Sequence, residues 1–229
     1  VTVLVLGGNN RTCGESKSRT SIDLPGRQEE LLRAIQATGK PVILVMINGR
    51  PLSINYAKAH VPAILETWYP GAYGGQAVYD ILSGEYNPSG RLNCTIPKTA
   101  GQIPFNFPTK PNANIDGYGA PGVNGKQTRV NGALWYFGEG LSYTTYKYSN
   151  ISVQPAQVSK GDTVQVTFQV TNTGKREAAE VAQVYVAPVN PSIIRPHHEL
   201  KGYEKVKLAK GESRTVTVTL PESAFSFYD

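Results

Sequence analysis

The hydrophobic pattern changes its period along the chain, and this change limits the folds that are open to it. Segments 1–6 and 41–47 are nearly continuous apolar runs, which are typical of strands buried on both faces of a parallel sheet. Beyond Tyr143, apolar and polar residues alternate, as they do in strands with one buried face. Because one sheet does not satisfy both patterns, we expect an α/β domain followed by an all-β domain.

Helical segments separate the apolar runs of the first half. Residues 28–35 carry acidic side chains at the start and apolar ones at helical spacing, and Gly39 follows as a stop signal. A short helical or irregular stretch is expected at 55–60, a third strand at 63–68, and a second helix at about 74–82. Strands that alternate with helices predict a mostly parallel sheet with flanking helices.

The second half predicts a β-sandwich of the immunoglobulin or fibronectin kind. Turn signals such as Asn172-Thr173-Gly174 and Lys210-Gly211-Glu212 separate its alternating segments, which are 163–170, 182–186 and 215–220. The pattern leaves room for about six strands before Asp229, so we expect that a last edge strand is missing.

These patterns divide the chain into three parts. Residues 1–105 form the α/β part, and residues 143–229 form the β-sandwich. Residues 106–142 are rich in Pro, Gly, Asn and aromatic residues and have no lasting periodicity, so they are predicted to be an irregular linker or an active-site loop.

Composition and charge exclude several classes of function. The net charge is +6, but Lys and Arg are scattered rather than clustered, so we expect no nucleic-acid partner. The longest apolar run, 42–47, is far shorter than the ~20 residues that cross a bilayer, so we expect no membrane insertion. No signal peptide is visible at Val1, and we expect that upstream residues have been removed.

Cysteines and glycosylation motifs leave alternatives open. Cys13 and Cys94 could form a disulfide or stay as two buried thiols, because spacing alone does not say whether their Cβ atoms meet. Sequons begin at Asn10, Asn93 and Asn150 and would accept glycans in a secreted eukaryotic protein.

No cofactor or metal is expected. Gly7-Gly8 ends a predicted strand, but neither the dinucleotide motif nor the Walker motif follows it. His197 and His198 are adjacent without further ligand-like partners, and we expect His60 to lie at the surface or to cap a helix.

The loop after Leu6 is the first place to look for a site, because ligands of open parallel sheets bind outside the carboxyl ends of the strands. This loop contains Glu15 among the cationic residues Arg11, Lys17 and Arg19. A carboxylate in such a loop can act as a proton donor, and the alternative is an ordinary solvated side chain.

The same loop carries a family resemblance. Gly14-Glu15-Ser16-Lys17-Ser18-Arg19, followed by residues 22–31 with Leu-Pro-Gly-Arg-Gln, resembles the pattern of glycoside hydrolase family three. Five further segments resemble the same family in the same order, namely 68–71, 74–77, 87–92, 137–144 and 199–206. Ser16, Lys17 and Ser18 depart from the common pattern, in which many relatives have Gly and Asp, so the sequence does not predict the path of the loop.

The resemblance implies an enzyme of three parts, of which this chain contains two. The family has a TIM-like barrel with an aspartate nucleophile, an α/β sandwich that supplies the general acid/base, and a fibronectin-like domain. This chain resembles the second half of the α/β sandwich and most of the fibronectin-like domain. The resemblance therefore implies that the nucleophile lies outside this chain, in an N-terminal barrel domain or a separate chain.

Carried onto this sequence, the resemblance makes Glu15 the general acid/base. In a retaining mechanism its carboxyl group must come within about 5 Å of the nucleophile. Arg19 matches the arginine of the motif, and we expect it to anchor the loop through a carboxylate or a backbone carbonyl, or to lie near the substrate.

The function implied is that of a retaining, exo-acting β-glycosidase that removes terminal β-D-glucosyl or β-D-xylosyl residues from oligo- or aryl-β-glycosides. A secreted or periplasmic location is implied with it. The chain alone is expected to be inactive, since it lacks the nucleophile. Trp68 and Tyr69 could stack on a sugar, although packing is the more usual role of such residues.

The alternative is a non-catalytic fragment that stabilises an assembly or binds carbohydrate. Carbohydrate binding by the β domain would need an exposed aromatic platform, for which Tyr185 and Tyr203 are the candidates.

Overall fold

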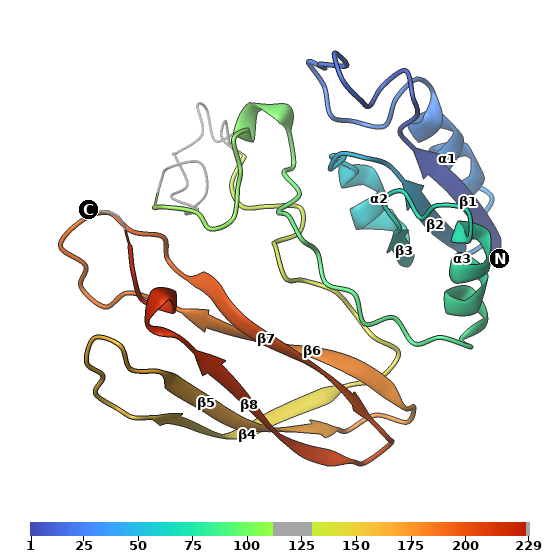
Figure 1. Cartoon of the computed structure of the whole chain (residues 1–229). Coiled ribbons are helices and arrows are strands. Elements are labelled where there is room, and N and C mark those ends of the chain that lie inside the picture. The colour runs from blue at the N-terminus through green and yellow to red at the C-terminus, as the bar shows by residue number, and fades with distance from the viewer. Residues whose placement is uncertain (112–129, 228–229) are drawn as a thin grey trace, which may run out of the picture. The chain divides into compact units, whose positions relative to one another are not determined.

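A computed structural model describes residues 1–111 and 130–227 of the chain (Figure 1). Residues 112–129 of the segment 106–142, predicted as a linker or active-site loop, therefore lie outside the described residues. Two compact units are present. The first contains Val1–Leu82 and Cys94–Asn106 and ends at Phe137, whereas the second contains Ser83–Asn93, Phe107–Pro111 and the described residues from Gly138 onward. The chain crosses between the units more than once, and the three consecutive segments proposed from the sequence stay a prediction.

The first unit has the expected parallel sheet. Its strands are β1 (Thr2–Gly7), β2 (Val42–Ile47) and β3 (Ala63–Glu66), with the order β1-β2-β3 and both pairings parallel. Its helices are α1 (Gln28–Gln36), α2 (Asn55–His60) and α3 (Gly74–Ser83). The central strand β2 supplies the most deeply buried side chains, which include Val42, Leu44, Val45 and Met46. The predicted α/β class is confirmed.

Strand β1 differs from the prediction of a strand buried on both faces. Leu4 and Leu6 are buried, but Val3 and Val5, which point to the opposite face, are 48% and 55% exposed. The expectation is wrong for β1 because no described part of the chain covers that second face. A continuous apolar run indicates that both faces of a strand are suited to burial, but it does not indicate which part of the protein covers each face.

Residues 94–106 and 130–137 also belong to the first unit and contain no regular strand. Ile96 pairs with Trp135 in an isolated bridge, and a short 3₁₀ helix, η1 (Ala100–Gln102), follows. The side chain of Gln102 is buried, and its Nε2 donates to the carbonyl oxygens of Val130 and Gly132 at 3.2 and 2.9 Å. Gln102 thus links the segment 94–106 to residues 130–132.

The second unit is a two-sheet β structure, as predicted. Its strands are β4 (Tyr146–Gln154), β5 (Val164–Asn172), β6 (Ala178–Val186), β7 (Glu199–Leu208) and β8 (Ser213–Leu220). One sheet has the order β4-β5-β8 and the other pairs β6 with β7, and all pairings are antiparallel. A further 3₁₀ helix, η2 (Glu222–Ala224), follows β8.

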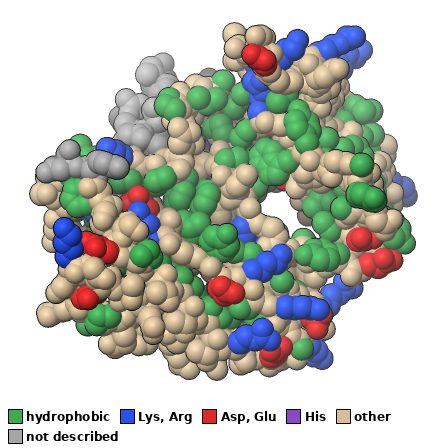
Figure 2. Space-filling model, viewed as in Figure 1, with side chains coloured by type: hydrophobic (Ala, Val, Ile, Leu, Met, Phe, Trp, Pro, Cys, Tyr) green, Lys and Arg blue, Asp and Glu red, His purple; other side chains and the backbone are tan. Residues whose placement is uncertain are grey.

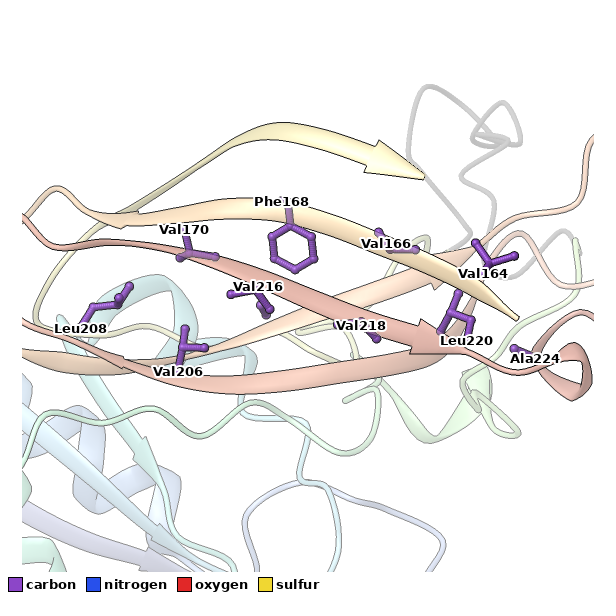
Figure 3. Close-up of a cluster of buried hydrophobic side chains, with 11 residues drawn as sticks. Val164, Val166, Phe168, Val170, Val206, Leu208, Val216, Val218, Leu220 and Ala224 are labelled. Atoms are coloured by element: carbon purple, nitrogen blue, oxygen red, sulfur yellow. The ribbon is translucent and has the colours of Figure 1, made fainter. Parts of the chain in front are cut away.

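The core of the second unit forms from the side chains that alternate inward along these strands (Figure 3). Strand β5 shows the rule most clearly, because buried residues occupy every second position from Val164 to Asn172. Its partners in the core come from both sheets and from η2, and they include Leu208, Val216, Val218, Leu220 and Ala224. The period-two pattern of the sequence is therefore the pattern of the core.

Charged side chains do not form a single basic field on the face shown in Figure 2, where Lys and Arg are interspersed with Asp and Glu. In the described ranges, none of the helices has the length and apolar character that a membrane span requires.

Candidate active site

The candidate site lies at the carboxyl ends of the three parallel strands. Gly7 pairs with Ile47 at the end of β1, and Met46 pairs with Glu66 at the end of β3. Parallel strands that end in register bring the segments after them to one edge of the sheet. The three segments are the loop 8–27, the turn Asn48-Gly49-Arg50, and the turn Thr67-Trp68-Tyr69.

The loop leaves the sheet at a glycine whose conformation and close surroundings disfavour any side chain. Gly7 has φ +141°, and a Cβ atom there would lie 2.0 Å from the carbonyl oxygen of Ile47. The side-chain amide of Gln28 also pairs with this residue, accepting from its N–H at 2.7 Å and donating to its carbonyl oxygen at 2.9 Å. Gln28 is the first residue of α1, so the pair fixes the start of α1 against the end of β1.

Glu15 lies on this loop and is exposed. Its neighbours Gly14 and Ser16 both have positive φ, +136° and +56°. Within the described part of the chain, its carboxylate makes no hydrogen bond or ion pair. The loop thus presents a carboxyl group on a sharply turned backbone at the expected edge of the sheet.

Arg19 lies further along the loop and is half-buried. Its Nε donates a 3.0 Å hydrogen bond to the carbonyl oxygen of Ser21. Nearby, the N–H of Ser53 donates to the carbonyl oxygen of Ile22 at 2.8 Å, which attaches the end of the loop to the body of the unit. The anchoring role of Arg19 stays a prediction, although this contact is of the kind that such a role requires.

Cys13 contacts the two neighbouring turns. Its thiol lies near the Tyr69 hydroxyl and the Arg50 side chain. The Tyr69 hydroxyl is the main reason why the pKa of the Cys13 thiol is lowered, and the Arg50 charge lowers it further. The same contact raises the pKa of the Tyr69 hydroxyl. Tyr69 is 57% exposed, so its role includes this polar contact as well as packing.

Arg50 contacts the loop at a second point. Its Nη2 donates a 2.7 Å hydrogen bond to the carbonyl oxygen of Lys17. The backbone of Arg50 is held in turn, because Nδ2 of the buried Asn48 donates to its carbonyl oxygen at 2.9 Å. Arg50 thus joins the turn after β2 to the loop after β1.

Glu66 holds the third segment, the turn Thr67-Trp68-Tyr69, through a hydrogen bond to its backbone. Burial raises the pKa of its carboxyl group, although hydrogen bonds from the N–H of Trp68 and from Asn48 oppose this effect. Its Oε1 accepts from the Trp68 N–H at 3.0 Å, and its Oε2 accepts from Asn48 Nδ2 at 3.3 Å. Trp68 has φ +52°, so Glu66 holds a left-handed residue in place.

Sequence reasoning missed three of these residues, namely Asn48, Arg50 and Glu66, and it considered Cys13 only as a disulfide partner or a buried thiol. A signal was available, because Asn48-Gly49-Arg50 and Glu66-Thr67-Trp68 stand at the ends of strands β2 and β3, as the Glu15 loop stands after β1. The rule that directs attention to the carboxyl end of one parallel strand applies equally to its neighbours.

The remaining predicted residues lie elsewhere. Cys13 and Cys94 are both free thiols, which excludes the disulfide between them. His60 is exposed and its ring contacts the ring of Tyr56, while His198 contacts the ring of Tyr185. Over residues 1–111 and 130–227, no cluster of His, Cys, Asp or Glu could hold a metal ion. Tyr203 is 65% exposed beside a shallow hollow between β7 and β8.

Comparisons with known proteins cover both halves of the chain. Residues 1–143 match the glycosyl hydrolase family 3 C-terminal domain, and residues 180–229 match a fibronectin type III-like domain. A periplasmic beta-glucosidase of Salmonella typhimurium is 40% identical over 100% of this chain, and a beta-xylosidase of Formosa agariphila is 43% identical over 95% of it. The chain spans 30% of the length of each of these relatives.

Solved structures give the same result. The beta-glucosidase of Listeria innocua, in complex with isofagomine, superposes with a TM-score of 0.88 at 38% identity. The superposition covers 99% of this chain and 32% of that one. A beta-glucosidase of Bifidobacterium adolescentis superposes with a TM-score of 0.78 at 34% identity and covers 100% of this chain.

Proposed function

This chain belongs to glycosyl hydrolase family 3, and on that premise we propose that it is the C-terminal part of a retaining, exo-acting β-glycosidase. The substrates are oligo- or aryl-β-glycosides with a terminal β-D-glucosyl or β-D-xylosyl residue. Relatives named as a beta-glucosidase and a beta-xylosidase support this substrate class. A periplasmic relative supports a periplasmic or secreted location.

Glu15 is the general acid/base of the proposed reaction. It protonates the departing glycosidic oxygen and then takes a proton from the attacking water. The observation that carries this assignment is the position of Glu15, exposed on a loop at the carboxyl edge of the parallel sheet. Exposure suits a group that must approach a nucleophile on another domain to within about 5 Å. Arg19 anchors the loop.

The nucleophile comes from a TIM-like barrel that precedes this chain or joins it as a separate chain. The length of the relatives supports such a partner, because the chain spans only 30% of the length of each. Val3 and Val5 expose one apolar face of β1, which a further part of the α/β sandwich would cover. Without the barrel, Glu15 has no nucleophile opposite it, and the chain alone is inactive.

The test is the variant Glu15→Gln in the full-length polypeptide. We expect kcat/KM for a disaccharide, which has a poor leaving group, to fall by about 10²–10⁴-fold, the usual contribution of general acid/base catalysis. A dinitrophenyl glycoside needs little protonation of its leaving group, so the first step of its hydrolysis should be affected much less. Glu30→Gln makes the same chemical change at an exposed position on α1 and is the matched control.

Equal losses on both substrates would count against the acid/base role. Full activity of Glu15→Gln on the disaccharide would favour the alternative, in which the chain stabilises an assembly or binds carbohydrate without taking part in catalysis.

A further inference from the structure

We infer that Arg50 is a positioning residue for Glu15, whose loop it holds through a hydrogen bond to the backbone of Lys17. The inference rests on the proposed function, because it assumes that the orientation of Glu15 matters for proton transfer. Arg50 belongs to a different strand end, after β2, and lies outside the segments in which the acid/base motif was recognised.

Arg50 contacts the loop on both sides of Glu15. Its Nη2 donates a 2.7 Å hydrogen bond to the carbonyl oxygen of Lys17, two residues after Glu15. Its side chain also lies near the thiol of Cys13, two residues before Glu15. Between Cys13 and Lys17 the loop turns through Gly14 and Ser16 at positive φ. A non-glycine residue such as Ser16 keeps that conformation only where its surroundings enforce it.

The backbone of Arg50 is itself fixed by buried residues. Asn48 is fully buried, and its Nδ2 is shared between the carbonyl oxygen of Arg50 and Oε2 of Glu66. Glu66 also fixes the backbone of Trp68. Through Asn48, the ends of β2 and β3 therefore set the position of Arg50.

Tyr69 is the second residue that lies near Cys13. Its ring lies directly against Gly49, where a Cβ atom would come within 2.3 Å of the ring, and its hydroxyl lies near the Cys13 thiol. Gly49 thus allows the ring to approach the backbone closely enough to reach the thiol. Cys13 therefore lies near both Tyr69 and Arg50.

The contact with the loop suits arginine better than lysine. The guanidinium is planar and carries donors in a fixed geometry, so it can donate to the Lys17 carbonyl oxygen while it lies near the Cys13 thiol. A lysine at this position retains the charge but has a single nitrogen on a flexible stem. Arg50→Lys therefore separates the geometric role from the electrostatic one.

The experiment compares Arg50→Lys with the unchanged full-length enzyme on a disaccharide and on a dinitrophenyl glycoside. The measured quantity is the ratio of the two kcat/KM values in one sample, which does not depend on how much of the protein is folded. We expect the ratio to shift against the disaccharide by about 10-fold or more, since small misplacements of catalytic groups can cost 10²-fold. Tyr69→Phe removes the hydroxyl that lies near Cys13 and should shift the ratio in the same direction.

Two further variants make the result decisive. Arg33→Lys changes an exposed arginine on α1 and should leave the ratio unchanged. The double variant Glu15→Gln with Arg50→Lys should have the same ratio as Glu15→Gln alone, because a residue that acts through Glu15 has no effect once Glu15 is lost.

The inference and the proposed function fail in different ways. If Arg50→Lys lowers both rates equally, or neither, while Glu15→Gln shifts the ratio, Arg50 does not position Glu15 and the proposed function stands. If Glu15→Gln does not shift the ratio, the acid/base assignment is wrong, and the role of Arg50 falls with it.

Discussion

Arg91 Nη2 lies 2.5 Å from Glu180 Oε2, and the two side chains are only 13% and 9% exposed. The ion pair attaches the turn 87–92, one of the family motifs, to the beginning of β6. A second bond reinforces it, because the Tyr148 hydroxyl donates to Glu180 Oε1 at 2.8 Å. Burial and this bond to Glu180 together raise the pKa of the Tyr148 hydroxyl.

We predict that breaking this buried pair destabilises the β-sandwich. Arg91→Met or Glu180→Leu leaves one buried charge without its partner, which costs about 3–5 kcal/mol. The double variant removes both charges and should recover much of that loss. Hydrogen exchange of the β6 and β7 amides measures the local stability directly.

The control for this prediction is Glu177→Gln. Glu177 pairs with Lys207 at 2.6 Å, but both side chains are more than half exposed, at 56% and 70%. Exposed pairs contribute little because water screens them. If the Glu177 variant were as damaging as the Glu180 variant, burial would not be the reason for the effect.

Glu66 should make the stability of the first unit depend on pH. Burial raises the pKa of its carboxyl group in the folded state above the ordinary value of about 4.3. The folded state then binds the proton more tightly, so stability falls as pH rises from the unfolded pKa through the folded one. Glu66→Gln keeps an acceptor oxygen for the Trp68 N–H but has no carboxyl group to titrate. The stability of the variant relative to the unchanged protein should therefore increase as the pH rises and then level off.

Thermal unfolding between pH 4 and pH 7 tests the Glu66 prediction. Cys94 does not interfere, because burial and the charge of Glu66 raise the pKa of its thiol above the usual value, and it stays neutral over this range. A difference between the variant and the unchanged protein that is constant with pH would show that Glu66 titrates normally.

Two glycines of the first unit should respond to alanine in opposite directions. Gly7→Ala places a Cβ atom 2.0 Å from the carbonyl oxygen of Ile47 at φ +141°, and we expect a loss of about 1–3 kcal/mol or more. Gly75 lies in α3 with open space around its Cβ position, so Gly75→Ala should stabilise by up to about 1 kcal/mol. Urea unfolding of both variants measures the two signs, and a stable Gly7→Ala protein would contradict the close approach of β1 and β2.

Much of the fold follows from local patterns. The helices at Gln28–Gln36 and Gly74–Ser83 were predicted nearly to their ends, because periodicity indicates which faces of an element can be buried. The same signal predicted β5, β6 and β8 of the sandwich, but it did not predict β4. The exposed face of β1 was not predicted, since the sequence of a strand carries no information about a covering layer that this chain does not supply. The position of Glu15 on a loop at a strand end was predicted from the pattern, whereas its role comes from the family.

By itself, the sequence determined the order of the two folds, the family, and the candidate acid/base, because periodicity and motif spacing are local properties of the chain. Only the tertiary structure decided what surrounds that residue. Arg50 and Lys17 are 33 residues apart, and Arg91 and Glu180 are 89 residues apart. Such contacts arise when strand ends meet at one edge of a sheet or when a turn packs on a distant strand. Local patterns predict the helix, strand or turn in which each partner lies. Only the packing of these elements determines which side chains come into contact.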